Sequence, residues 1–226
     1  MNHRTPAYTT SMKHLSALCT LLLLPLTATA TTTYTNTWNV STVIPDNDPV
    51  GFTSSQTIAP GITSIDSVVV NLDFTGGWNG DLYAYLVSSN GGYAVLLNRP
   101  GVSATTPDGA GSSGMNVTIA DSATYAIYDI HTAIPMSGGQ VTGTFQPDGR
   151  TTDPQTVLNT DSRTAMLSSF DGKSANGTWT LFVADMSPGF TSTLQSWSLT
   201  VTSVPEPSSC LLGAFGLVPL FLRRRV

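Results

Sequence analysis

The stretch SVVVNLDF, residues 67–74, places apolar residues at 68, 70, 72 and 74 and polar residues at 67, 71 and 73, a period of two interrupted only by Val69. Such alternation is typical of a β-strand with one face on a hydrophobic core and the other in water. The pattern recurs at residues 82–86, 115–119, 141–145, 179–183 and 197–201. Turn signals rich in Gly, Asn, Asp and Pro separate these segments, and no helical period is present between them. The body is therefore predicted to be all-β, an antiparallel jelly-roll β-sandwich.

Residues 1–30 have the composition of a signal peptide. Arg4 and Lys13 make the beginning basic, residues 15–26 are apolar, and Ala28 and Ala30 supply the small residues of a cleavage site. We expect signal peptidase to cleave after Ala30. An uncleaved N-terminal anchor is the alternative.

Residues 204–226 form a second targeting segment. Pro205-Glu206-Pro207 is followed by an uncharged run at residues 208–222 and by Arg223-Arg224-Arg225. The run predicts a transmembrane helix, although a short one, because about 20 residues span a bilayer comfortably. The arginines are expected on the cytoplasmic side. A permanent tail anchor and a buried strand are the alternatives.

This order of proline motif, apolar run and arginine cluster resembles the PEP-CTERM sorting signal of Gram-negative bacteria. The resemblance implies recognition by an exosortase, a membrane enzyme of the transpeptidase kind. It also implies a transient inner-membrane anchor, and then sorting to the cell surface or an extracellular matrix that often contains exopolysaccharide. It implies nothing about the activity of the rest of the chain.

Between the two ends lie an N-terminal segment or first strand, residues 31–43, and the sandwich, residues 44–203. The two cysteines, Cys19 and Cys210, fall in the targeting segments, so we expect neither a disulfide nor thiolate chemistry in the body. The body has four basic residues against thirteen aspartates. This acidic balance argues against binding of nucleic acid, or of an anionic polysaccharide held by charge alone.

Two blocks of the body resemble the P domain (P/Homo B), which follows the catalytic domain of proprotein convertases and many bacterial subtilisin-like proteases. The first block, residues 68–100, contains Gly80-Asp81-Leu82, and the second, residues 170–201, contains Asn176-Gly177-Thr178-Trp179. The resemblance implies a β jelly roll, in agreement with the alternation. The turn at residues 189–193 lacks the aspartate that this family usually has there.

The sequence offers no catalytic set. A Ser-His-Asp hydrolase needs a histidine base oriented by a carboxylate, and the body has one histidine, His131, two residues after Asp129. One histidine without cysteine also makes no zinc site. Because a signal peptide begins the chain, we expect no protease domain before the body. No enzymatic activity is predicted.

Calcium is the candidate metal, because it binds the carboxylate, carbonyl and amide oxygens in which Asp-rich loops abound. The candidate ligands are Asp73 and Asp81, on either side of a glycine-rich turn, and Asp185, at the end of a predicted strand. The alternative is that Asp81 and Asp185 only accept backbone hydrogen bonds in turns.

The aromatic residues Trp78, Tyr83 and Tyr85 are candidates for stacking on sugar rings. The alternative is that they simply favour strands or lie under other parts of the fold. Trp179 and Trp197 are expected in the core. We thus predict an exported, non-catalytic surface or matrix protein. A polysaccharide-binding module and an accessory domain for a serine-type endopeptidase are the alternatives.

Overall fold

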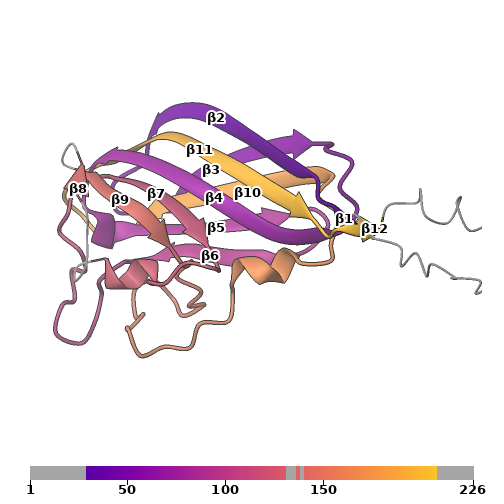
Figure 1. Ribbon diagram of the computed structural model, residues 1–226. Coiled ribbons are helices and arrows are strands. Elements are labelled where there is room, and N and C mark those ends of the chain that lie inside the picture. Colours follow the sequence, from indigo (N-terminus) through magenta and orange to yellow (C-terminus); the bar gives the residue numbers. More distant parts are fainter. Residues whose placement is uncertain (1–28, 131–135, 138–139, 208–226) are drawn as a thin grey trace, which may run out of the picture. The chain divides into compact units, whose positions relative to one another are not determined.

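A computed structural model describes residues 29–130, 136–137 and 140–207. Its residues 29–207 form one compact unit. It contains a two-layer β-sandwich with only three short 3-10 helices (Figure 1). Within the described residues no helix combines the length and the apolar character that crossing a membrane requires. The predicted signal peptide and the predicted helix at residues 208–222 lie outside this part, apart from Thr29 and Ala30.

One layer is a four-stranded sheet in the order β3-β10-β5-β6. Its strands are β3 (Asp48–Ile58), β10 (Gly177–Asp185), β5 (Leu82–Ser88) and β6 (Tyr93–Asn98). All neighbouring strands in it are antiparallel.

The other layer is a six-stranded sheet in the order β2-β11-β4-β7-β9-β8. Its strands are β2 (Thr33–Val43), β11 (Ser192–Ser203), β4 (Ile65–Gly76), β7 (Met115–Ala120), β9 (Gln140–Phe145) and β8 (Met136–Ser137).

The prediction of a purely antiparallel sandwich is wrong at one pair, because β7 and β9 run parallel, with Met115 opposite Val141 and Ile119 opposite Phe145. Parallel neighbours need a long crossover. The connection at residues 121–139 provides it, and η2 (Ile127–Asp129) lies within that connection. The other helices are η1 (Asn79–Asp81), before β5, and η3 (Leu167–Phe170).

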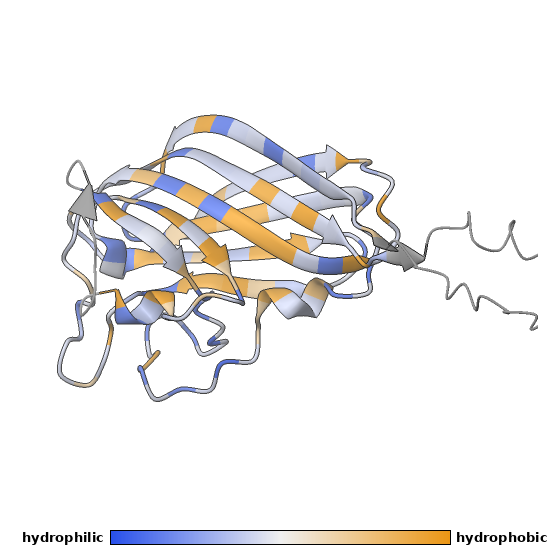
Figure 2. Ribbon diagram, in the orientation of Figure 1, coloured by the Kyte–Doolittle hydropathy of each residue, from blue (hydrophilic) through white to orange (hydrophobic). Residues whose placement is uncertain are grey.

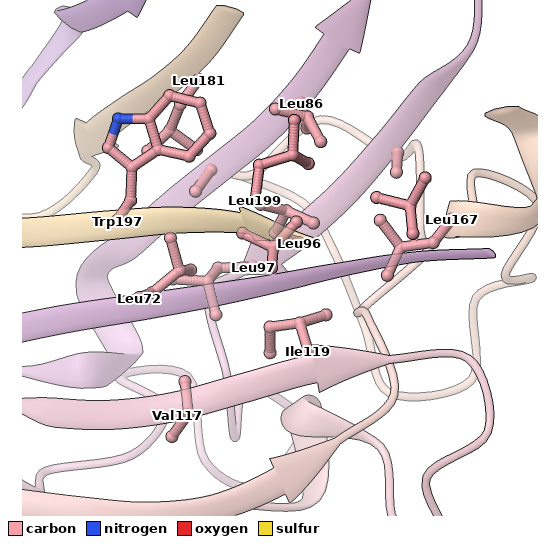
Figure 3. Close-up of a cluster of buried hydrophobic side chains, with 14 of the residues drawn as sticks. Leu72, Leu86, Leu96, Leu97, Val117, Ile119, Leu167, Leu181, Trp197 and Leu199 are labelled. Carbon is pink, nitrogen blue, oxygen red and sulfur yellow. The ribbon is translucent and has the colours of Figure 1, made fainter. Parts of the chain in front are cut away.

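The core lies between the two sheets. Along β4 the apolar members of the opening stretch, Val68, Val70, Leu72 and Phe74, are all buried. They face apolar residues of the other sheet, such as Leu86 and Leu181 (Figure 3). Figure 2 shows the same alternation of apolar and polar residues along the strands. Each fully buried side chain of this size contributes ~1.5–3 kcal/mol, so the period-two pattern is the main source of stability.

Trp179 and Trp197 are both fully buried, which confirms their predicted place in the core. Each indole N–H finds an acceptor there. Trp179 donates to the carbonyl of Ala175 at 2.9 Å, and Trp197 donates to Ser54 Oγ at 3.0 Å. Burial of these large rings therefore leaves neither N–H without a partner.

The two ends of the body lie together. β1 (Thr29–Ala30) pairs with β12 (Glu206–Pro207), with Ala30 opposite Glu206. Next to this pair, the amide of Thr32 donates to Ser203 Oγ at 2.8 Å, and the amide of Ser203 donates to the Thr32 carbonyl at 2.8 Å. We call this the termini end of the sandwich.

Three loops meet at the opposite end, at residues 44–47, 77–81 and 186–191. The strand register places them there, because Asp185 lies opposite both Leu82 and Asp48, and Ser192 lies opposite Gly76. We call this the loop end.

Candidate functional site

Asp81 and Asp185, two of the predicted calcium ligands, lie on neighbouring segments of the loop end. Asp81 closes η1, Asp185 is the last residue of β10, and the amide of Met186 donates to the Asp81 carbonyl at 2.8 Å. Asp81 is 3% exposed and Asp185 is 0% exposed. The β5–β10 pairing thus brings together Asp81 and Asp185, which are more than a hundred residues apart in the sequence.

Burial and neighbouring negative charges, Asp185 for Asp81 and Asp46 for Asp185, make both carboxylates hard to ionise. Burial first, and then the negative charge of Asp185, raise the pKa of Asp81 to about 6, although Arg99 opposes the shift. Burial also raises the pKa of Asp185, against the amides of Ser187 and Asn47. The two groups thus form a pair of like charges with little solvent to separate them.

Protein donors satisfy this pair only in part. The amide of Ser187 donates to Asp185 Oδ1 at 3.2 Å, whereas Asp185 Oδ2 is buried and has no hydrogen-bond partner among the described residues. The Asn47 amide also favours the charged form of the Asp185 carboxyl group, but it does not reach hydrogen-bond geometry. Arg99 Nη2 is 4.0 Å from Asp81 Oδ1, beyond a hydrogen bond, and its guanidinium donates to the carbonyls of Gly80 and Pro107 instead.

Asp73, the third predicted ligand, belongs to a different part of the surface. It lies on β4 between the buried Leu72 and Phe74, and therefore faces outward from the six-stranded sheet. Gln140 Nε2 donates to Asp73 Oδ1 at 3.2 Å. In the described part of the chain, no group of three or more His, Cys, Asp or Glu side chains is placed to hold a metal ion.

The predicted sugar-stacking residues fall into two groups. Tyr83 and Tyr85 lie on the outer face of the four-stranded sheet with Tyr93 and Phe182, two residues that the sequence analysis did not single out. The rings of Tyr85 and Phe182 are stacked, with centroids 4.7 Å apart at an angle of 15°. Because these residues are direct cross-strand partners, each ring covers one face of the other, and that face is not available to a ligand. This group presents ring edges and hydroxyls rather than a flat platform.

Trp78 stacks on Phe190 instead, with ring centroids 5.2 Å apart at an angle of 12°. Both residues belong to the loop end, and Phe190 is 56% exposed. A parallel pair of this kind leaves the outer ring face free, which is the geometry that sugar stacking uses. Phe190 lies in the turn at residues 189–193, and nothing in its sequence spacing marked it as the partner of Trp78.

A further acidic group surrounds a cavity of about 220 Å³ beside η3. Asp66, Asp121 and Asp171 line it. Asp121 accepts hydrogen bonds from the amides of Leu167 and Ser168 and so fixes the start of η3. Partial burial, followed by the charges of Asp121 and Asp66, raises the pKa of Asp171. The sequence carried no signal for this group, because its members come from three separate segments.

The remaining predicted residues are described incompletely or not at all. His131, Ala28, the apolar run at 208–222 and Arg223–Arg225 lie outside the described residues. Pro205 follows the end of β11, and Glu206 and Pro207 form β12 at the termini end.

The chain belongs to a known family. The model of the proprotein convertase P-domain matches residues 65–201, which is more than half of the 226 residues. The P domain is a non-catalytic accessory domain of subtilisin-like proteases. No curated protein matches the chain.

The fold is similar to that of a serine protease of Aeromonas sobria, solved by crystallography alone and in complex with a chaperone. In the complex, the identity is 18%, the TM-score is 0.43, and the match covers 77% of this chain and 27% of the protease. In the protease alone, the identity is 20%, the TM-score is 0.43, and the match covers 80% of this chain and 28% of the protease. The chain therefore spans about a quarter of the length of these structures.

Proposed function

We propose that this chain is an exported, non-catalytic cell-surface or extracellular-matrix protein, in which a P-domain jelly roll is the binding module and the C-terminal segment is a sorting signal. One observation carries the proposal: Thr32 and Ser203, which adjoin the two predicted targeting segments and remain after the expected cleavage, exchange two hydrogen bonds at the termini end. The loop end, with Phe190 and its stacked partner Trp78, lies at the other end of the body.

The tail supplies the route to that position. Pro205-Glu206-Pro207, the apolar run and the terminal arginines resemble a sorting signal that an exosortase-type membrane enzyme processes after signal peptidase has removed residues 1–30. The apolar run is short and contains Gly213, Gly216 and Pro219, which suits a cleavable anchor better than a permanent one. The protein then reaches the cell surface or the extracellular matrix.

Sorting is tested in a Gram-negative host that carries the processing enzyme. We expect the wild-type chain to be shortened and to leave the inner membrane. The variant with Pro205, Glu206 and Pro207 all changed to Ala should keep its full length there. A control variant with Asp153→Ala and Pro154→Ala, which changes an acidic residue and a proline in a loop outside the tail, should behave like wild type. Normal shortening and release of the tail variant would show that the segment is only a hydrophobic anchor.

A second candidate function, binding of a neutral polysaccharide in the matrix, is favoured by the stack of the half-buried Trp78 on the exposed Phe190. The acidic body excludes an anionic glycan held by charge. Glycan-array binding of the protein should be lost in Trp78→Ala and Phe190→Ala and kept in Tyr125→Ala, which alters an exposed aromatic residue elsewhere. Equal binding by all three variants would exclude the stack as the site.

A further inference from the structure

β2 forms an edge of the six-stranded sheet (Figure 1). In the described part of the chain, β11 is the only strand that pairs with it. With eleven residues, β2 is as long as β3 and longer than the strands at the other edges. A long sheet edge presents a row of backbone N–H and C=O groups to which another strand can be added.

The backbone groups of alternate residues of β2 point away from β11. The Ser203 amide donates to the Thr32 carbonyl at 2.8 Å, so Thr32 directs its backbone groups toward β11. Direction alternates along the strand from there. The Thr37 amide agrees with this alternation, because it donates to the side chain of Asn36 at 3.0 Å. We call the residues whose backbone groups point outward the open row; they are residues 33, 35, 37 and 39.

The other edges of the two sheets carry features that oppose further pairing. β3 begins with Asp48-Pro49, in which the proline has no N–H and the aspartate accepts the Val50 amide at 2.9 Å. β6 is covered, since the Val95 amide donates to the Ala165 carbonyl at 3.0 Å. β8 has only two residues. β2, by contrast, contains neither a charged residue nor a proline.

The distribution of charge indicates which partner fits this edge. The body has four basic residues and thirteen aspartates, but none of them lies in β2 or in the adjacent β11. A charged peptide would find no opposite charge here. A second copy of the chain brings the same uncharged strand, so that no like charges come to lie directly opposite one another. The edge is therefore complementary to itself, as a two-fold symmetric interface requires.

We propose that β2 pairs antiparallel with β2 of a second copy and thereby joins the two six-stranded sheets. The two-fold axis passes through the pair formed by Asn36 and its copy, because only this register uses the whole open row. The outward residues then meet one another in the pairs 33–39 and 35–37. Pairing ends before Ser41, whose φ of +50° interrupts the extended strand.

This register also covers two aromatic side chains. Tyr34 and Trp38 lie on the inner face of β2, where they pack against the core but remain half-buried. A two-fold axis perpendicular to the sheet keeps the inner faces of both copies on the same side. Trp38 therefore comes to lie opposite Tyr34 of the second copy, and aromatic pairs across strands are stabilising.

The interface is small, and the dimer is therefore reversible. Residues 33–39 span ~24 Å at ~3.4 Å per residue. One strand pair of this length buries less than the ~800 Å² per partner of a stable complex. Because both bodies are acidic, salt should strengthen the dimer by screening their repulsion. The pairing depends neither on how the chain is sorted nor on what its loop end binds.

Sedimentation equilibrium of the full-length chain in detergent tests the proposal. Between about 5 µM and about 500 µM, a range of weak association, the wild type should form a dimer that tightens as salt is added. Thr35→Pro removes an outward N–H and leaves the pairing with β11 intact, so it should weaken dimerisation by ~10-fold or more. The matched control Thr35→Val keeps the N–H and should dimerise like wild type.

A cysteine at the two-fold axis gives an independent readout. In a chain with Cys19→Ser and Cys210→Ser, the additional change Asn36→Cys should produce a disulfide-linked dimer under mild oxidation, because the two cysteines face each other. Thr144→Cys, an exposed position on β9 at the far side of the sheet, should give little dimer.

The cross-link keeps the proposal testable if Thr35→Pro does not fold. A wild type that stays monomeric at every concentration would overturn the proposal and leave the edge to a different protein. Undiminished dimerisation of a folded Thr35→Pro variant, or equal cross-linking of the two cysteine variants, would also overturn it, because association would then use another surface or the apolar ends of the chain.

Discussion

Arg150 and Asp148 form a fully buried, two-pronged ion pair. Arg150 Nε is 2.7 Å from Asp148 Oδ1, and Arg150 Nη2 is 2.6 Å from Asp148 Oδ2. The same guanidinium donates to the carbonyls of Asn98 and Leu158 and lies over the Tyr128 ring at 4.9 Å. The pair therefore fastens the long irregular segment after β9 to the end of β6.

Loss of Arg150 should be costly. Arg150→Met leaves the buried Asp148 carboxylate without its cationic partner and with only the backbone amide of residue 150 as a donor, so we expect the free energy of unfolding to fall by ~3–5 kcal/mol in urea titrations. Arg163→Met should cost less, because the Arg163 side chain donates only to neutral oxygens. The double change Asp148→Leu with Arg150→Met should recover part of the loss. If the free energy of unfolding of the single Arg150→Met variant lay within about 1 kcal/mol of the wild-type value, the buried Asp148 carboxylate would not depend on its ion pair with Arg150.

Gly77 and Gly61 provide a matched pair of backbone positions. Both have positive φ angles, +64° and +77°, but a Cβ on Gly77 would lie 1.9 Å from Ser192 Oγ and 2.9 Å from Ser192 N, whereas one on Gly61 would meet nothing within 4 Å. Gly61→Ala should cost ~1–2 kcal/mol from the left-handed conformation alone. Gly77→Ala should cost ~1–3 kcal/mol more. Equal losses of stability for the two variants in thermal unfolding would contradict the close contact between Gly77 and Ser192 of β11.

Tyr83 should resist ionisation. Burial first, and then the hydrogen bond to the Tyr93 hydroxyl at 3.0 Å, raise the pKa of Tyr83 far above its ordinary value of 10.0. The folded protein thus holds this proton more tightly than the unfolded chain, so the associated stability is present below pH 10 and is lost as the pH rises further. Ultraviolet titration should show a late phenolate fraction that appears only with unfolding.

Tyr83→Phe should remove part of that late fraction. Tyr85→Phe should remove a smaller part, because burial also raises the pKa of Tyr85. An unchanged late fraction in Tyr83→Phe would mean that Tyr83 does not contribute to it, and would contradict the shielding of its hydroxyl by burial and by Tyr93.

Trp197 should contribute more to stability than Trp38, its neighbour in the core. The two rings are 4.5 Å apart, but only Trp197 is fully buried and donates a hydrogen bond to Ser54. Trp197→Phe should lower the free energy of unfolding by ~1–3 kcal/mol, through lost packing and an unsatisfied Ser54 hydroxyl. Trp38→Phe should cost less than half of that in the same urea titration, and the reverse order would contradict the hydrogen-bond argument.

Two of the longer strands, β3 and β6, had no signal in the period-two pattern. β3 carries Ser, Thr and Gly rather than alternating apolar residues, and it is a strand because β10 offers it an open edge from Ile58 to Asp48. β6 is apolar at nearly every position because it packs on the core with one face and is covered by the segment after β9. The backbone amide of Asp148, in that segment, donates to the Leu96 carbonyl. Alternation identifies only strands that have one buried face and one solvent-exposed face. It therefore detected neither β3 nor β6.

The sequence by itself determined which residues of β4, β5, β7, β9, β10 and β11 face the core, because burial on one side of a strand depends only on local order along the chain. It also predicted both targeting segments and the P-domain family. Only the tertiary structure decided that β7 and β9 are parallel, that Trp78 stacks on Phe190, and that Asp81 meets Asp185 while Asp73 does not. These relationships join segments far apart in the sequence, and they follow from how two sheets pack and close their loops rather than from any local pattern.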